Sequence, residues 1–148
     1  MNIYHNIHNL NVNNVTFSNA IANKFSNYEK FYKIIYNVNG MTLNSIFLLV
    51  DIDYLNVVED HKKNKITFNI DEKTIDKIKK METLILENIN QYLQKDIVSS
   101  CTHNLVNHKC IYTMNTISKK NKKIYIRISG VWESNNQIGL TTKLTLVE

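Results

Sequence analysis

The chain has 148 residues, of which 43% are hydrophobic, so it is long enough to bury a core and too apolar for a wholly disordered protein. No apolar run approaches the roughly 20 residues of a membrane-spanning helix, and the polar start MNIYHNIHNLNVNN lacks the features of a signal peptide. The formal net charge of +5 modestly favours a polyanionic partner. We therefore expect a soluble, intracellular, single-domain protein over residues 1–148.

The first half of the chain predicts β-structure. Residues 1–28 are Asn-rich with weak periodicity, which indicates an N-terminal arm or a loosely packed first strand. The β-branched and aromatic run EKFYKIIYNV is followed by Asn39-Gly40 and the apolar SIFLLV. An Asn-Gly pair between apolar runs is a strong hairpin signal, because both residues tolerate positive φ. We predict a hairpin of roughly 30–38 with 41–50. DIDYLNVV continues or bends away from it, and the turn HKKNK precedes the strand KITFNI.

One helix is predicted over roughly Glu72 to Leu93. Apolar residues recur there at spacings that place them on one face: Ile75, Ile78, Ile85, Ile89 and Tyr92, with Leu84 and Leu86 nearby. Asn69 or Asp71 can cap the N-terminus of this helix. The solvated side is expected to carry the charged residues Lys77, Lys79, Lys80, Glu82 and Glu87.

The last third of the chain is predominantly β in character. QKDIVSSCTHNLVNHKC is ambiguous between a loop and a short strand. The runs KCIYTMNTI, KIYIRISGVWE and IGLTTKLTLVE, separated by the turns SKKNKK and SNNQ, predict a β-meander. Together these elements predict a mainly β, α+β fold: an OB-like small antiparallel β-barrel with a mid-chain helix.

A basic surface is predicted in this meander, because no acidic residue lies between Asp96 and Glu133. In KIYIRIS the isoleucines take one strand face, and Lys123, Tyr125 and Arg127 take the other. Cations that follow phosphates and aromatic rings that stack on bases suit single-stranded nucleic acid. An ordinary solvated hairpin tip is the alternative. The candidate nucleic-acid-binding residues are Lys109, Lys119, Lys120, Lys122, Lys123, Tyr125, Arg127 and Trp132.

Three aromatic residues have core packing as the favoured role. A single Trp after a glycine, such as Trp132 after Gly130, more often packs in a core or closes a barrel than stacks on bases. Tyr32 and Tyr36 share one strand face and could extend a binding groove, but packing in the core is again favoured.

Cys101, His103, His108 and Cys110 form a Cys-x-His…His-x-Cys arrangement. In a hairpin, residues two apart point to the same side, so four zinc ligands could converge. The spacing matches no common zinc finger, so free thiols and surface histidines are the favoured interpretation. We predict no metal and no other cofactor.

Catalytic motifs are missing from the sequence. It contains no GxSxG, no Walker-type glycine loop and no HExxH, and its three glycines cannot build a phosphate-binding loop. Asp51 and Asp53 could hold a metal at a strand end, as in some nucleases, but no other acidic residues cluster with them in sequence. The sequence therefore predicts a protein that is not an enzyme.

Four stretches together resemble a known family: KFYKIIYNVNGMTLNSIFLLV, KITFNID, TIDKIKKMETLILENI and KIYIRISGVWESNNQIGLTTKL. Their succession is similar to that of the OB-fold single-stranded DNA-binding proteins of podophages and large nucleocytoplasmic DNA viruses, over roughly residues 30–148. The resemblance implies sequence-tolerant binding of single-stranded DNA in viral replication, recombination or repair. It carries the binding role over to Lys123, Tyr125 and Arg127, and less directly to Trp132. Phage members end in an acidic tail, whereas this chain ends in LTLVE.

Two functions from different classes follow. The first is a single-stranded nucleic-acid-binding protein whose partner is DNA, with RNA as the alternative. A homo-oligomer is possible, no membrane partner is expected, and the sequence does not say which replication proteins recruit it. A viral member would act in the host cytoplasm or nucleus. The second is a structural or assembly β-domain that self-associates without binding nucleic acid, because an apolar edge strand such as SIFLLV invites pairing.

Overall fold

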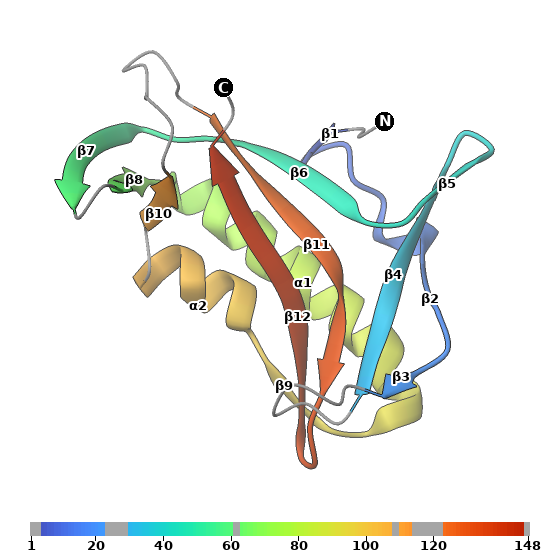
Figure 1. Ribbon diagram of the computed structural model, residues 1–148. Coiled ribbons are helices and arrows are strands. Elements are labelled where there is room, and N and C mark those ends of the chain that lie inside the picture. The colour runs from blue at the N-terminus through green and yellow to red at the C-terminus, as the bar shows by residue number, and fades with distance from the viewer. Residues whose placement is uncertain (1–3, 23–29, 61–62, 108–109, 114–122, 147–148) are drawn as a thin grey trace.

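The computed structural model describes residues 4–22, 30–60, 63–107, 110–113 and 123–146 of the chain (Figure 1). These residues form a mostly β structure with a mixed sheet and two α-helices. The helical elements are the 3-10 turn η1 (Val12–Asn14), α1 (Glu72–Leu93) and α2 (Ser100–Asn107). The strands are β1 (Tyr4–Asn6), β2 (Val15–Phe17), β3 (Ile21–Ala22), β4 (Lys30–Val38), β5 (Met41–Leu43), β6 (Ile46–Asp51), β7 (Tyr54–Asp60), β8 (Lys63–Asn69), β9 (Asp96–Val98), β10 (Cys110–Thr113), β11 (Lys123–Glu133) and β12 (Gln137–Leu146).

Strand β11 is the centre of the main sheet, whose order is β1-β6-β11-β12-β9. β12 pairs antiparallel along one edge of β11. On the other edge, residues 123–128 pair with β6 and residues 130–133 pair with β4. The β11–β12 register shifts between Ile128 and Gly130, at the point where the partner on the other edge changes. β1 is parallel to β6 and β9 is parallel to β12. Within the described ranges β1 and β9 end this order, and a closed barrel is not shown.

The hydrophobic core lies between one face of this sheet and the two helices, with α1 running behind β11 and β12 in the view of Figure 1. Ile124, Ile126 and Ile128 are fully buried on that face, as their alternation in the sequence predicts. β7, β8 and β10 form a separate sheet of order β10-β8-β7, which contributes Ile66 and Phe68 to the same core.

The predicted helix is confirmed by α1, which spans Glu72–Leu93, but its buried face differs in part. Tyr92 is 83% exposed and Leu84 is 43% exposed, whereas the expected solvated residue Glu82 is fully buried. At 100° per residue Tyr92 lies within about 20° of buried Ile85 around the helix axis, so its spacing is right and what it lacks is a neighbour over the last turn of α1. Asp71 is the N-cap residue, yet its side chain makes no capping hydrogen bond.

Helix α2 corrects the sequence analysis, which expected a loop or a short strand here, and buried Glu82 explains why the helix forms. The backbone N–H of Cys101 donates to Glu82 Oε2 at 2.8 Å, and that of Thr102 donates to Oε1 at 3.1 Å. The Thr102 hydroxyl donates to the same Oε1 at 2.7 Å. One carboxylate thus accepts from the first turn of α2, where helix N–H groups lack partners within the helix. The stabilisation comes from another helix, not from α2's own sequence.

The predicted hairpin is confirmed at its turn and corrected in its second strand. Asn39 and Gly40 have φ of 48° and 78°, as a tight hairpin turn requires. β4 pairs with β5 over residues 41–43 only, and β6 then leaves to pair with β11. β6, which contains most of SIFLLV, lies between β1 and β11 and is not an edge strand.

The N-terminal segment packs on the sheet where the structure describes it. Residues 4–22 contribute β1 against β6, and β2 and β3 against β4. Val15 is buried in the core, which anchors this segment.

In the part of the chain that the structure describes, no helix is both long enough and apolar enough to cross a membrane.

Candidate nucleic-acid interface

The sheet has a second face, opposite the helices, that carries the predicted binding residues. Because side chains alternate along β11, Lys123, Tyr125 and Arg127 point away from the buried isoleucines. The antiparallel register places Tyr125 beside Leu49 of β6, and Arg127 between Phe47 of β6 and Lys143 of β12. Residues from three adjacent strands therefore meet on this face.

Three rings on this face form a contact group that we call the aromatic cluster: Tyr4 of β1, Phe47 of β6 and Tyr125 of β11. Their centroids are 5.9 Å apart for Tyr4–Phe47, 5.4 Å for Tyr4–Tyr125 and 6.0 Å for Phe47–Tyr125. Tyr4 is 47% exposed, and the other two rings are half-buried. The cluster is packed enough to hold its shape and open enough to be reached by a ligand.

Cations surround the aromatic cluster. The Arg127 guanidinium carbon lies 5.8 Å from the centre of the Phe47 ring, a cation–π distance, and Arg127 Nε donates to Ser45 Oγ at 3.4 Å. Lys143 stands directly across the strand pair from Arg127 and is exposed. Lys123 lies further along β11, 3.8 Å from Asp51, in an exposed ion pair that contributes little energy.

The structure brings three of the predicted binding residues together and buries a fourth. Lys123, Tyr125 and Arg127 share the open face, whereas Lys109, Lys119, Lys120 and Lys122 lie outside the described residues. Trp132 is only 9% exposed, and a Cβ added to Gly139 would lie 2.4 Å from its ring. The indole therefore covers the Gly139 backbone, which leaves little ring surface for a base.

Sequence reasoning missed Tyr4, Phe47 and Lys143. Phe47 and Lys143 could have been found by extending the alternation of β11 to its neighbours, once those neighbours were known. Tyr4 had no signal, because it lies in a short strand that pairs in parallel with a distant one. Such a pairing is fixed by tertiary structure and leaves no local pattern.

The tyrosines of β4 do not extend this face, because they pack against the core. Tyr36 is buried, and the Tyr32 hydroxyl donates to Glu133 Oε1 at 2.8 Å. Burial and the Glu133 carboxylate raise the pKa of Tyr32 to about 12. Core packing, the favoured role for both tyrosines, is confirmed.

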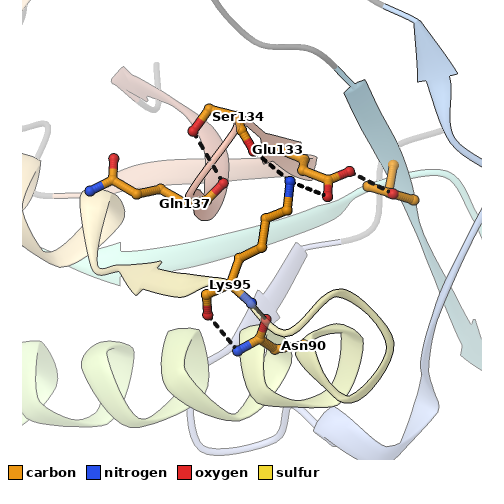
Figure 2. A network of polar contacts seen from close by, with 6 residues as sticks. Asn90, Lys95, Glu133, Ser134 and Gln137 are labelled. Carbon is orange, nitrogen blue, oxygen red and sulfur yellow. Dashed lines mark hydrogen bonds and ion pairs between the residues drawn. The ribbon is translucent and has the colours of Figure 1, made fainter.

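Glu133 is the centre of a buried polar network at the end of β11 (Figure 2). Lys95 Nζ lies 2.9 Å from Glu133 Oε2 and donates to the Ser134 carbonyl at 2.7 Å. Burial alone would raise the pKa of Glu133, but hydrogen bonds from Lys95 and Tyr32 outweigh it and hold the pKa below its usual value. Asn90 completes the link to α1 through two hydrogen bonds with the Lys95 backbone. These groups fasten the sheet to the helix and are not open to a ligand.

The Cys/His arrangement does not have the hairpin geometry on which the zinc hypothesis depended. Cys101 and His103 lie on α2, where residues two apart are separated by about 200° around the helix axis. Cys101 is buried, and burial with the nearby Glu82 carboxylate raises the pKa of its thiol to about 12, which keeps it unreactive at neutral pH. His108 and the side chain of Cys110 lie outside what the structure describes.

No metal centre is found elsewhere in the described ranges, where no three His, Cys, Asp or Glu side chains gather closely enough to hold an ion. Asp51 and Asp53, the pair considered for a nuclease, therefore belong to no such group.

Comparison with known proteins adds no assignment, because no protein-family model, no curated protein and no solved structure matches the chain.

Proposed function

We propose that the open sheet face binds single-stranded nucleic acid with little sequence preference and without catalysis. The observation that carries this proposal is the aromatic cluster, which lies on an exposed sheet face with Arg127, Lys143 and Lys123 around it. Unpaired bases expose their flat faces, whereas a duplex hides them, so this combination favours single strands over double strands.

Base stacking and phosphate contacts make separate, separately measurable contributions to this binding. Stacking of one base on an aromatic side chain contributes roughly 1–3 kcal/mol, and every base has a face that can stack. Phosphate contacts release counterions, so affinity for a single strand falls with salt by a log–log slope of about −0.7 per contact. Three cations predict a slope of about −2 from the described residues. The lysines outside the described ranges would make the slope steeper.

The proposal includes the finer architecture and context that the family resemblance implies. It places an OB-like barrel around the β-meander, and it places the protein in viral replication, recombination or repair. The mid-chain helix and the long pair β11–β12 support this, since both lie where the resemblance expects them. An experimental structure that includes residues 108–122 would test whether the sheet closes.

Removing single rings from the aromatic cluster tests the site directly. Tyr4→Ala and Tyr125→Ala should each weaken binding to a labelled oligo(dT) by roughly five- to a hundredfold, as loss of one stacked base predicts. Tyr92→Ala is the matched control, because Tyr92 is an exposed tyrosine on α1, and it should bind as the wild type does. An unlabelled duplex should compete poorly with the single strand. Wild-type affinity in both cluster variants, or no binding at low salt, would refute the proposal.

The assembly function keeps less support than the sequence suggested. It relied on SIFLLV as an edge strand, but β6 pairs with a neighbour on each side. The aromatic cluster could still contact a second copy of the chain. Sedimentation velocity separates the two: a mass that stays constant with concentration, together with oligonucleotide binding, favours the nucleic-acid function. Self-association that Tyr4→Ala abolishes, without oligonucleotide binding, favours assembly.

A further inference from the structure

Strand β1 links the aromatic cluster to a partly buried histidine. Tyr4 points to the open face, and the next residue, His5, points to the opposite side of the sheet because strand side chains alternate. β1 is three residues long and pairs only with β6 among the described residues. A strand this short, held on one edge, opens at a small fraction of the cost of unfolding the protein.

His5 occupies a site that suits its neutral form alone. Its ring packs edge-on against Tyr36, with centroids 5.0 Å apart and planes at 76°. Its Nε2 is buried and has no hydrogen-bond partner in the described structure. Burial lowers the pKa of His5 below its ordinary value of 6.5. An imidazolium must carry a proton on Nε2, where it would find neither water nor an acceptor.

No neighbouring group in the described ranges offsets that charge. Residues 47–49 of β6, which pair with β1, have no titratable side chain, and β4 presents the Tyr36 ring, whose hydroxyl accepts from the Asn11 N–H at 3.0 Å. From the segment after β1, His8 contacts Lys77 of α1, with His8 Nδ1 and Lys77 Nζ 2.7 Å apart. None of these described groups is a carboxylate. The Tyr36 ring attracts a cation less than the loss of water penalises it.

We propose that His5 acts as a pH-dependent lock on β1, so that acid releases this strand and removes Tyr4 from the aromatic cluster. The inference rests on the proposed function for its effect on nucleic-acid binding, but release of β1 stands on the structure alone. Neutral His5 is compatible with the docked strand. Protonated His5 turns out to water and takes β1 with it.

The direction of the pH effect follows from linkage. The released strand takes up a proton near pH 6.5, the ordinary pKa of the residue, whereas the docked strand does so only at lower pH. Above about pH 7.5 protonation of His5 therefore has no effect on docking of β1. Between the His5 pKa of the released strand and that of the docked strand, docking weakens by up to about tenfold for each pH unit. Exposed histidines have the opposite effect, because their protonation adds positive charge and strengthens binding to a polyanion. The sign of the pH dependence thus separates the lock from general electrostatics.

Two measurements on the wild type and on His5→Phe test the lock, with His5→Leu as a second variant if Phe is not accommodated. Nuclear Overhauser cross-peaks between the Tyr4 and Phe47 rings report docking of β1 and need no nucleic acid. Polarisation of rhodamine-labelled oligo(dT) at constant ionic strength reports affinity. Between pH 7.5 and 5.5 the cross-peaks of the wild type should lose intensity, and its binding should weaken by up to about tenfold. The His5 variants should keep both the cross-peaks and the affinity.

The outcomes separate this inference from the proposed function. Ring cross-peaks that keep their full intensity in the wild type at pH 5.5 refute the lock, whatever the oligonucleotide does. Cross-peaks that weaken equally in the wild type and the His5 variants also refute it, since another group would then be responsible. Cross-peaks that weaken in the wild type alone, without oligonucleotide binding at pH 7.5, uphold the lock and refute the nucleic-acid function.

Discussion

Replacing the buried Glu82 tests whether α2 depends on a carboxylate from α1. Glu82→Ala leaves three buried donors without an acceptor: the N–H groups of Cys101 and Thr102 and the Thr102 hydroxyl. Each unsatisfied buried donor costs about 1–3 kcal/mol, and the removed carboxylate no longer has to be desolvated, which offsets part of the loss. We expect the free energy of unfolding to fall by about 3 kcal/mol, a large share of a typical 5–15 kcal/mol.

Urea denaturation followed by circular dichroism measures this loss. With an m-value of about 2 kcal/mol/M, the midpoint should move down by about 1.5 M. Glu82→Gln keeps one acceptor but turns an amide N–H toward a donor, so it should lose about half as much. Glu87→Ala, at an exposed position on the same helix, is the control and should change stability by less than about 0.5 kcal/mol. A loss below about 1 kcal/mol in Glu82→Ala would refute the capping role.

Three further substitutions test other parts of the structure. Gly139→Ala would place a Cβ 2.4 Å from the Trp132 ring, so we expect the free energy of unfolding to fall by about 1–3 kcal/mol. The fluorescence emission of Trp132, the one Trp of the chain, should shift to the red, and an unchanged spectrum would contradict the contact. The lowered pKa of Glu133 contributes stability above pH 4.5 that is lost as pH falls through the folded-state value. Glu133→Gln should therefore be less stable than the wild type at pH 7, and the difference should shrink as pH falls through the folded-state pKa of Glu133 in pH-dependent urea titrations. A difference that stays constant with pH would argue against the ion pair with Lys95. Tyr92→Ser should leave the unfolding midpoint unchanged, because that ring lies in solvent.

Local patterns predicted the elements whose stability is local. The Asn39-Gly40 turn, the helix from Glu72 and the alternation of KIYIRIS are each determined by residues close in sequence, and all three are confirmed. The core face of β11 and the outward position of Arg127 follow from the same alternation.

The sequence could not reveal what depends on distant partners. α2 forms around a carboxylate 18 residues before its first residue, and a Glu at a helical position normally predicts a solvated face. The aromatic cluster needs Tyr4, whose place depends on a parallel pairing with residues about 40 positions later. Tyr92 matched the helical spacing but lies beyond the part of α1 that the sheet covers.

The position of β11 in the sheet has a consequence for synthesis on the ribosome. Among the described strands β6 pairs with β11 over its whole length and with the short β1, so its longer pairing forms only after residues 123–128 have emerged. Helix α1 can form earlier, because its hydrogen bonds are local, but the sheet face on which it packs does not yet exist. The nascent chain therefore holds an apolar strand, β6, with one unpaired edge until β11 emerges, the stage at which such edges associate wrongly. Long-range pairing of this kind also slows folding in free solution. We expect this protein to need chaperone protection until its last two strands are made.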